Sequence, residues 1–196
     1  MNRPLRVAAL AVATILLFSA CASDPLADDF KETDQNYVSG DGSVTEYPIA
    51  ERGEPVDFEA ETDRGDTVSS DDYRGEVLVV NFWYAGCPPC RVEAPDLEEL
   101  NQLYDGEGAT FLGVNVRDQA PQSKEFAKRW GISYPSVIDV DKGNMLLAFA
   151  GTVGANAVPT TLVIDKQGRV AARILGRVSE PSILDTLIRD TIDETS

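Results

Sequence analysis

A pair of cysteines stands between a buried strand and a helix, and this arrangement constrains the fold more than any other feature of the chain. The segment Glu76–Trp83 is short, apolar and rich in β-branched residues, which is typical of a strand covered on both faces. Pro88 then opens a helical stretch that ends near Gly106. Cys87 and Cys90 therefore lie where the strand leads into the helix, which is the setting of a redox-active cysteine pair.

The start of the helix gives the two sulfurs different predicted roles. The helix dipole and the free amide groups there favour the thiolate of Cys87, which is the form that attacks a disulfide. Cys90 lies one turn further along, where its sulfur can displace the mixed disulfide. Since Pro88 and Pro89 have no N–H, the amide of Cys90 is the main remaining donor to the thiolate. We predict Cys87 as the nucleophile, Cys90 as the resolving cysteine, and a Cys87 pKa less depressed than in a strongly oxidising protein.

The other apolar segments predict an α/β fold, with a central mixed sheet and helices on both faces. Residues 160–164 and 170–175 flank a short glycine-containing loop and predict an antiparallel hairpin. A smaller hairpin is expected near the start of the domain. The remaining predicted elements are strands at 110–116 and 136–138 and helices at 122–130, at 145–149 and from Pro181 onward.

The first 20 residues predict a signal peptide of the lipoprotein type. Arg3 and Arg6 precede the apolar run Val7–Phe18, which is too short to span a bilayer core that needs about 20 helical residues. A permanent transmembrane helix is therefore the weaker interpretation. Small residues followed by Cys21 resemble a bacterial lipobox, in which the cysteine is acylated and anchors the protein. The alternative is an ordinary secretory signal with a leftover cysteine.

Residues 21–54 predict an acidic flexible tether, and residues 55–196 predict one folded domain. Residues 24–54 contain nine acidic residues and only two basic ones, Lys31 and Arg52. Tyr37, Tyr47 and Pro48 could pack locally on the domain, so the last stretch could be ordered. The whole chain has a formal net charge of −16, which argues against a nucleic-acid partner.

Other interpretations of the cysteine pair are weaker. A zinc site needs four ligands, and the chain has no histidine and no further free cysteine; a copper carrier lacks a further ligand for the same reason. We therefore predict no metal and no other cofactor. A purely structural disulfide in so short a loop would remove little chain entropy. A peroxiredoxin normally has Thr or Ser three residues before its cysteine, where this chain has Tyr84.

The segment 79–95, VVNFWYAGCPPCRVEAP, resembles the active-site segment of the TlpA/ResA group of extracytoplasmic thioredoxin-like proteins. The resemblance covers roughly residues 54–195. It implies a thioredoxin-like fold of the AhpC/TSA-redoxin superfamily, with a TlpA-type insertion around residues 132–154. Membrane-tethered members reduce or exchange disulfides, some of them in apocytochrome c during haem attachment, and others support oxidative folding. A membrane thiol-disulfide carrier is the implied redox partner.

The same resemblance assigns two further catalytic residues. Pro159 matches a cis proline that lies opposite the cysteines and lets the backbone of Val158 pair with an extended substrate. Glu93 matches a glutamate of the ResA-like members and stands one helical turn after Cys90. Thioredoxin has a buried aspartate where this chain has Asn81. We expect partial burial to raise the pKa of Glu93, so that it accepts the proton of Cys90; the alternative is a solvated helix residue.

The predicted function is disulfide exchange with cysteine-containing partner proteins. The enzyme is expected to be lipid-anchored at the outer face of the bacterial cytoplasmic membrane, with its two sulfurs open to these partners. The alternatives are a disulfide donor in oxidative folding and a non-catalytic thioredoxin-like binding lipoprotein. Aromatic side chains are expected to form walls around the sulfurs, although part of this set could be plain core. The residues that flank the cysteines complete the predicted site. The residues expected to contact substrate are Trp83, Tyr84, Pro88, Pro89, Tyr134 and Val158.

Overall fold

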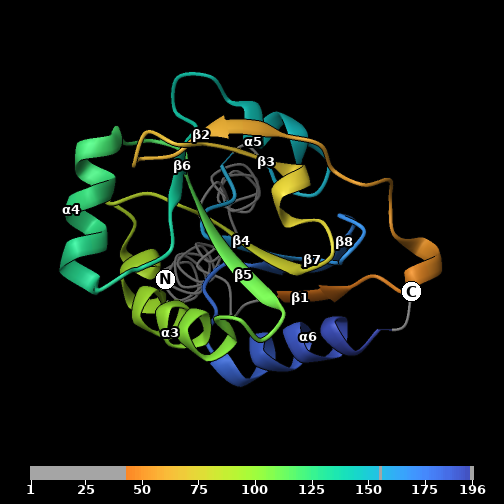
Figure 1. Ribbon diagram of the computed structural model, residues 1–196. Helices are drawn as coiled ribbons and strands as arrows, with labels where there is room; N and C mark the ends of the chain where they lie inside the picture. The colour runs from red at the N-terminus through yellow and green to blue at the C-terminus, as the bar shows by residue number, and fades with distance from the viewer. Residues whose placement is uncertain (1–42, 155, 195–196) are drawn as a thin grey trace, which may run out of the picture. The chain divides into compact units, whose positions relative to one another are not determined.

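A mixed sheet runs through the centre of the fold (Figure 1). The computed structural model describes residues 43–154 and 156–194. The strands are β1 (Ser43–Glu46), β4 (Val77–Trp83), β5 (Ala109–Asn115), β6 (Ser136–Ile138), β7 (Thr160–Ile164) and β8 (Val170–Leu175). Their order is β1-β8-β7-β4-β5-β6, in which β4, β5 and β6 are parallel and β1, β8 and β7 join by antiparallel pairing. The predicted mixed sheet is confirmed.

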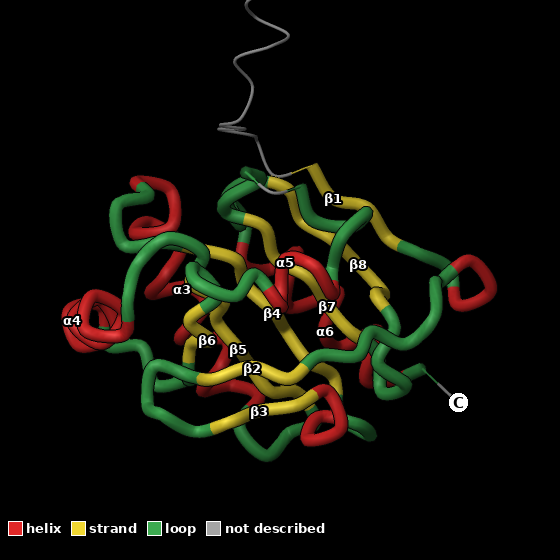
Figure 2. The backbone as a smooth tube through the Cα atoms, turned by 90° about the horizontal axis from the view of Figure 1, so that it is seen from above, coloured by secondary structure: helices red, strands yellow, loops and turns green. Residues whose placement is uncertain are grey.

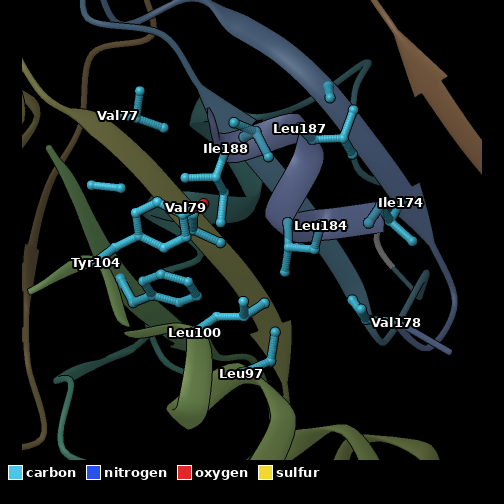
Figure 3. Close-up of a cluster of buried hydrophobic side chains, with 14 of the residues drawn as sticks. Val77, Val79, Leu97, Leu100, Tyr104, Ile174, Val178, Leu184, Leu187 and Ile188 are labelled. Carbon is cyan, nitrogen blue, oxygen red and sulfur yellow. The ribbon is translucent and has the colours of Figure 1, made fainter. Parts of the chain in front are cut away.

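Helices cover both faces of this sheet. The helices α3 (Pro88–Tyr104) and α6 (Pro181–Asp193) pack on one face, where their leucine and isoleucine side chains meet β4 and β8 (Figure 3). The short helix α5 (Asn144–Ala148) and the hairpin β2 (Glu59–Glu61) and β3 (Thr67–Ser69) cover the other face. Helix α4 (Ala120–Trp130) lies beyond the β6 edge (Figure 2). This arrangement is the predicted thioredoxin-like α/β fold.

The position of strand β4 in the sheet explains why its sequence is apolar except for Asn81. All seven of its residues are buried, and its side chains alternate between the two faces. Val77 and Val79 enter the core under α3 and α6, whereas Leu78 and Val80 enter the core under α5. A central strand covered on both faces has no solvent side, so the alternation of polar and apolar residues disappears.

The last part of the predicted tether belongs to the folded domain. Residues 43–46 form the edge strand β1 on β8, and the 3-10 turn η1 (Ile49–Glu51) follows. The amide of Tyr47 donates to the carbonyl of Ala171 at 2.8 Å. Backbone pairing of this kind does not require an apolar segment, which is why composition alone placed the boundary at 54. The signal peptide, Cys21 and residues 22–42 lie outside the described residues.

Two regions away from the sheet centre complete the description. The segment 132–154, which the resemblance assigned to an insertion, forms β6 and α5. Within residues 43–154 and 156–194, no helix is both long and apolar enough to cross a bilayer.

Candidate active site

The two cysteines form a disulfide at the start of α3. The S–S distance is 2.01 Å, and the two Cα atoms are 5.3 Å apart. Cys87 is the N-cap residue, and Pro88 and Pro89 occupy the first two positions of the helix. The amide of Cys90 donates to Sγ of Cys87 at 3.2 Å, so it is the donor that the two prolines leave available. This amide is placed to stabilise a Cys87 thiolate when the disulfide opens.

The disulfide is buried, although sulfurs open to a partner were expected from the sequence. The exposed fraction is 0% for Cys87 and 2% for Cys90. Trp83, Phe126 and Val158 pack with the two cysteines in one apolar cluster, and these side chains cover the sulfurs. The expectation of an open disulfide is therefore wrong for this oxidised form. A partner thiolate can reach Sγ of Cys87 only after part of this cover moves aside.

The Val158–Pro159 peptide bond is cis, as the resemblance implied. The side chain of Val158 is buried among the cysteines. The Val158 amide donates to the carbonyl of Asn156 at 3.0 Å, so this N–H is occupied within its own loop. Gly176 donates its amide to the carbonyl of Pro159 at 2.9 Å, which ties the proline to the end of β8. The Val158 N–H must exchange this partner before it can pair with a substrate strand.

Glu93 is almost completely buried, with an exposed fraction of 1%. Its Oε1 accepts a hydrogen bond from Nδ2 of Asn81 at 3.0 Å, and its Oε2 accepts one from the amide of Val178 at 2.9 Å. Burial raises the pKa of Glu93 to about 7, although these two hydrogen bonds and the charge of Arg177 act to lower it. The alternative of a solvated helix residue is therefore wrong. The carboxyl group can gain and lose a proton near neutral pH.

Asn81 links Glu93 to the space behind Cys90. Its Nδ2 also donates to Oγ1 of Thr161 at 3.0 Å, so the amide bridges Glu93 on α3 and Thr161 on β7. A cavity of about 10 Å³, lined in part by Asn81, Cys90 and Tyr134, lies beside it. That volume suits about one water molecule. From the sequence, Asn81 was notable only as a residue that cannot ionise. Its position as a polar residue inside an apolar strand was the signal for this role.

The predicted substrate-contacting residues divide into two groups. The ring of Trp83 packs on Phe126 with centroids 4.3 Å apart, and its Nε1 donates to Oγ of Ser136 at 3.2 Å. Tyr134 is also buried and packs on Phe111. Both rings are thus buried beside the cysteines: Trp83 packs with the two sulfur-bearing residues, and Tyr134 lines the small cavity next to Cys90. Direct contact of these two rings with a substrate stays a prediction. The other group remains at the surface: Pro88 is exposed, and Tyr84 and Pro89 are half-buried.

The loop after β5 holds the segment that precedes Cys87. Oδ2 of Asp118 accepts a hydrogen bond from the amide of Ala85 at 2.6 Å. The guanidinium of Arg117 lies 4.2 Å from the centre of the Tyr84 ring. Oδ1 of Asn115 accepts from the amides of Arg117 and Asp118, which is the turn that Asn favours after a strand. These contacts were not predicted from the sequence, and the Asn at the strand end was the available signal.

The part of the chain that the structure describes contains no cluster of three or more acidic, cysteine or histidine side chains that could hold a metal ion. The two sulfurs are bonded to each other, and the carboxyl group of Glu93 is held by two N–H donors. The arrangement supports chemistry at a disulfide, with an ionisable carboxyl group one helical turn away.

Comparisons with known proteins identify the family. The model of the Redoxin family matches residues 51–188. The thiol-disulfide oxidoreductase ResA of Geobacillus thermodenitrificans is 38% identical over 112 residues, which are 57% of this chain and 62% of that protein. The chain thus spans less than two thirds of that relative. The ResA of Halalkalibacterium halodurans is 31% identical over 137 residues, 69% of this chain and 74% of that protein.

A solved structure agrees with these relatives. A secreted thiol-disulfide isomerase from Corynebacterium glutamicum superimposes with a TM-score of 0.70 and is 33% identical. The match covers 81% of this chain and 97% of that one. The chain belongs to the Redoxin family, and within it to the ResA-like thiol-disulfide oxidoreductases.

Proposed function

We propose that this chain exchanges or reduces disulfides in extracytoplasmic proteins through Cys87 and Cys90. The observation that carries the proposal is the disulfide at the start of α3, with the amide of Cys90 donating to Sγ of Cys87. A helix start stabilises the thiolate that leaves when such a bond opens. The raised pKa of Glu93 and the cis Pro159 add support, because they supply a proton acceptor and a fixed backbone turn beside the pair.

The reaction in the reducing direction has two steps. The Cys87 thiolate attacks one sulfur of the partner's disulfide, so a Cys87–partner bond forms and the first partner thiolate leaves. Cys90 then loses its proton and attacks Sγ of Cys87, which re-forms the Cys87–Cys90 bond and releases the second partner thiolate. The partner gains two electrons and two protons, and this protein loses them. The oxidising direction is the reverse of these steps.

Glu93 serves as the proton acceptor for Cys90 in this scheme. A general base works best when its pKa is near the working pH, and burial raises the pKa of Glu93 to about 7. Asn81 holds the carboxyl group and borders the cavity beside Cys90. We infer that the proton passes through this polar region, because the surrounding side chains are apolar.

We also propose a place and a partner for this reaction. The residues around Cys21 resemble a lipobox, which supports a lipid-anchored protein at the outer face of the bacterial cytoplasmic membrane. The resemblance to the ResA group supports cysteine-containing proteins such as apocytochrome c as substrates and a membrane thiol-disulfide carrier as the redox partner. The similarity to a secreted thiol-disulfide isomerase favours a second use, disulfide exchange during oxidative folding.

An insulin-reduction assay with dithiothreitol tests the proposed activity. The full chain should accelerate the reduction, and the Cys87→Ser variant should not, because the attacking sulfur is missing. A Cys21→Ser variant should keep the rate of the unchanged protein, since the anchor takes no part in the chemistry. Equal rates for the unchanged chain and Cys87→Ser would contradict the proposal and favour a non-catalytic binding lipoprotein.

A further inference from the structure

A groove of about 560 Å³ lies next to the disulfide, between the start of α3 and α4. Ala85 and Arg91 line it from the α3 side, and Phe126, Arg129 and Trp130 line it from α4. Phe126 belongs to the apolar cluster that covers the two cysteines. A segment bound in the groove would therefore touch the cover of the disulfide.

The groove lining contains two arginines, Arg91 and Arg129, and one carboxylate, and the carboxylate of Asp118 lies next to it on the amide of Ala85. Among residues 43–154 and 156–194, no carboxylate pairs with Arg91 or Arg129, whereas Arg52, Arg74, Arg169 and Arg189 all have such partners. Nε of Arg91 donates to the carbonyl of Ala85 at 2.7 Å, and the Arg129 guanidinium lies 5.7 Å from the centre of the Trp130 ring. Glu125 is the acidic residue in the lining.

The other cations of α4 do not add to this groove. Lys124 and Lys128 are exposed on the opposite side of the helix from the lining residues Gln122, Phe126 and Arg129. The chain as a whole has a formal net charge of −16, so two arginines in one groove without an ion pair among the residues described stand out against an acidic protein. Local positive charge beside a reactive site attracts an anionic partner and speeds its encounter.

We propose that this groove binds the segment next to the reactive cysteine of the partner protein, and that it selects segments with an acidic side chain beside an apolar one. The acidic side chain would pair with Arg91 and Arg129, and the apolar side chain would pack on Trp130 and Phe126. This inference rests on the proposed function and adds to it a class of substrate. Arginine is suited to the task because its planar guanidinium pairs with a carboxylate through two hydrogen bonds.

Two matched peptides test the inference. Both peptides have the same length and one internal disulfide. The two residues next to the first cysteine are Asp-Leu in one peptide and Lys-Leu in the other. The reduced full chain is mixed with each peptide, and the second-order rate constant of peptide reduction is measured by stopped flow at low and high salt. The acidic peptide should react about tenfold faster at low salt, and the ratio should approach one at high salt.

Variants separate charge recognition from changes in the cysteines. Arg129→Glu should remove or invert the preference, whereas Arg189→Glu, the same charge change on the exposed surface of α6, should leave it unchanged. Hydroxyethyl disulfide, which is small and uncharged, should react at the same rate with all three proteins. Equal rates for the two peptides, or an unchanged preference in Arg129→Glu, would overturn the inference while the proposed function stands. If the unchanged protein reduced neither peptide nor hydroxyethyl disulfide, the proposed function itself would be contradicted.

Discussion

Two buried carboxyl groups, Glu93 on α3 and Asp165 directly after β7, have almost the same exposed fraction, but their pKa values are shifted in opposite directions. The exposed fraction is 1% for Glu93 and 2% for Asp165. Burial raises the pKa of Glu93 to about 7. Burial also acts to raise the pKa of Asp165, but hydrogen bonds from the Arg169 amide and from the Arg52 and Arg169 side chains outweigh it and lower that pKa.

The difference lies in the partners. Glu93 accepts hydrogen bonds from two neutral donors, whereas Oδ2 of Asp165 lies 2.8 Å from Nη1 of Arg52 and 2.8 Å from Nε of Arg169. A carboxylate held by two guanidinium groups stays charged and ties segments together. A buried carboxyl group that accepts hydrogen bonds only from neutral donors can change its protonation state. Asp165 is therefore suited to structure and Glu93 to proton transfer.

The largest expected effect comes from breaking the Asp165 cluster. Asp165→Asn should lower the free energy of unfolding by about 3–5 kcal/mol, because it leaves the buried Arg52 side chain, 4% exposed, with only Glu194 as a charged partner. Urea unfolding at pH 7 measures the loss. The pKa of Asp165 is lowered in the folded state, so its contribution is present above its ordinary pKa of 3.8 and is lost as the pH falls through the folded value. A loss below about 1 kcal/mol would show that the cluster is an ordinary surface pair.

Glu93 should show the opposite pH dependence. Because its pKa is raised from 4.5 to about 7, its contribution to stability is complete below 4.5 and is lost as the pH rises through 7. Glu93→Gln cannot ionise, so its free energy of unfolding should rise relative to the unchanged protein by about 3 kcal/mol between pH 4.5 and pH 9. Urea unfolding of both oxidised proteins at several pH values measures the difference. A difference that stays constant with pH would show that Glu93 has an ordinary pKa.

Removing a neutral donor from Glu93 should have a smaller effect. Asn81→Ala deletes the hydrogen bond from Nδ2 to Oε1, so the pKa of Glu93 should rise further. The free energy of unfolding should fall by about 1–2 kcal/mol, because Asn81 also holds Thr161. Titration of the Glu93 side-chain carbon by nuclear magnetic resonance gives the pKa, and Thr161→Val is the matched control that removes the other hydrogen bond alone. An unchanged Glu93 pKa in Asn81→Ala would contradict this role of the amide.

The smallest effect should come from an exposed ion pair. Arg189 lies 3.4 Å from Asp185 on α6, and its side chain is 55% exposed. Arg189→Gln should change the free energy of unfolding by less than about 0.5 kcal/mol, because water and salt screen such a pair. Urea unfolding in the same buffer provides the comparison with Asp165→Asn. A loss as large as that of Asp165→Asn would mean that burial does not set the difference between the two pairs.

The sheet was predictable from sequence because its strands have strong local patterns. Residues 136–138, 160–164 and 170–175 match the predicted strands residue for residue, and the last two flank a loop rich in turn residues. The edge strand β1 was not predictable, because its segment is polar and is held by backbone pairing with β8. Local patterns thus predicted the strands with several buried apolar side chains and missed β1, whose one apolar residue, Val44, is exposed.

The site shows the same division. The cysteine pair, the cis Pro159 and the raised pKa of Glu93 follow from local sequence and from the resemblance. The second donor to Glu93 is the amide of Val178, 85 residues away along the chain, and a backbone amide leaves no mark in a sequence. The burial of the disulfide depends on how Phe126 of α4 packs, which a sequence pattern for α4 does not contain.

The pH dependence of the resolving step tests most directly whether Glu93 serves the cysteine pair. When the reduced full chain reacts with Ellman's reagent, the second release of thionitrobenzoate reports the attack of Cys90 on the mixed disulfide at Cys87. The unchanged protein should show a rate that rises with a midpoint near pH 7, the pKa of Glu93. In Glu93→Gln this midpoint should vanish, and the step should slow by about 100-fold. The same rate and the same pH profile in both proteins would contradict the account.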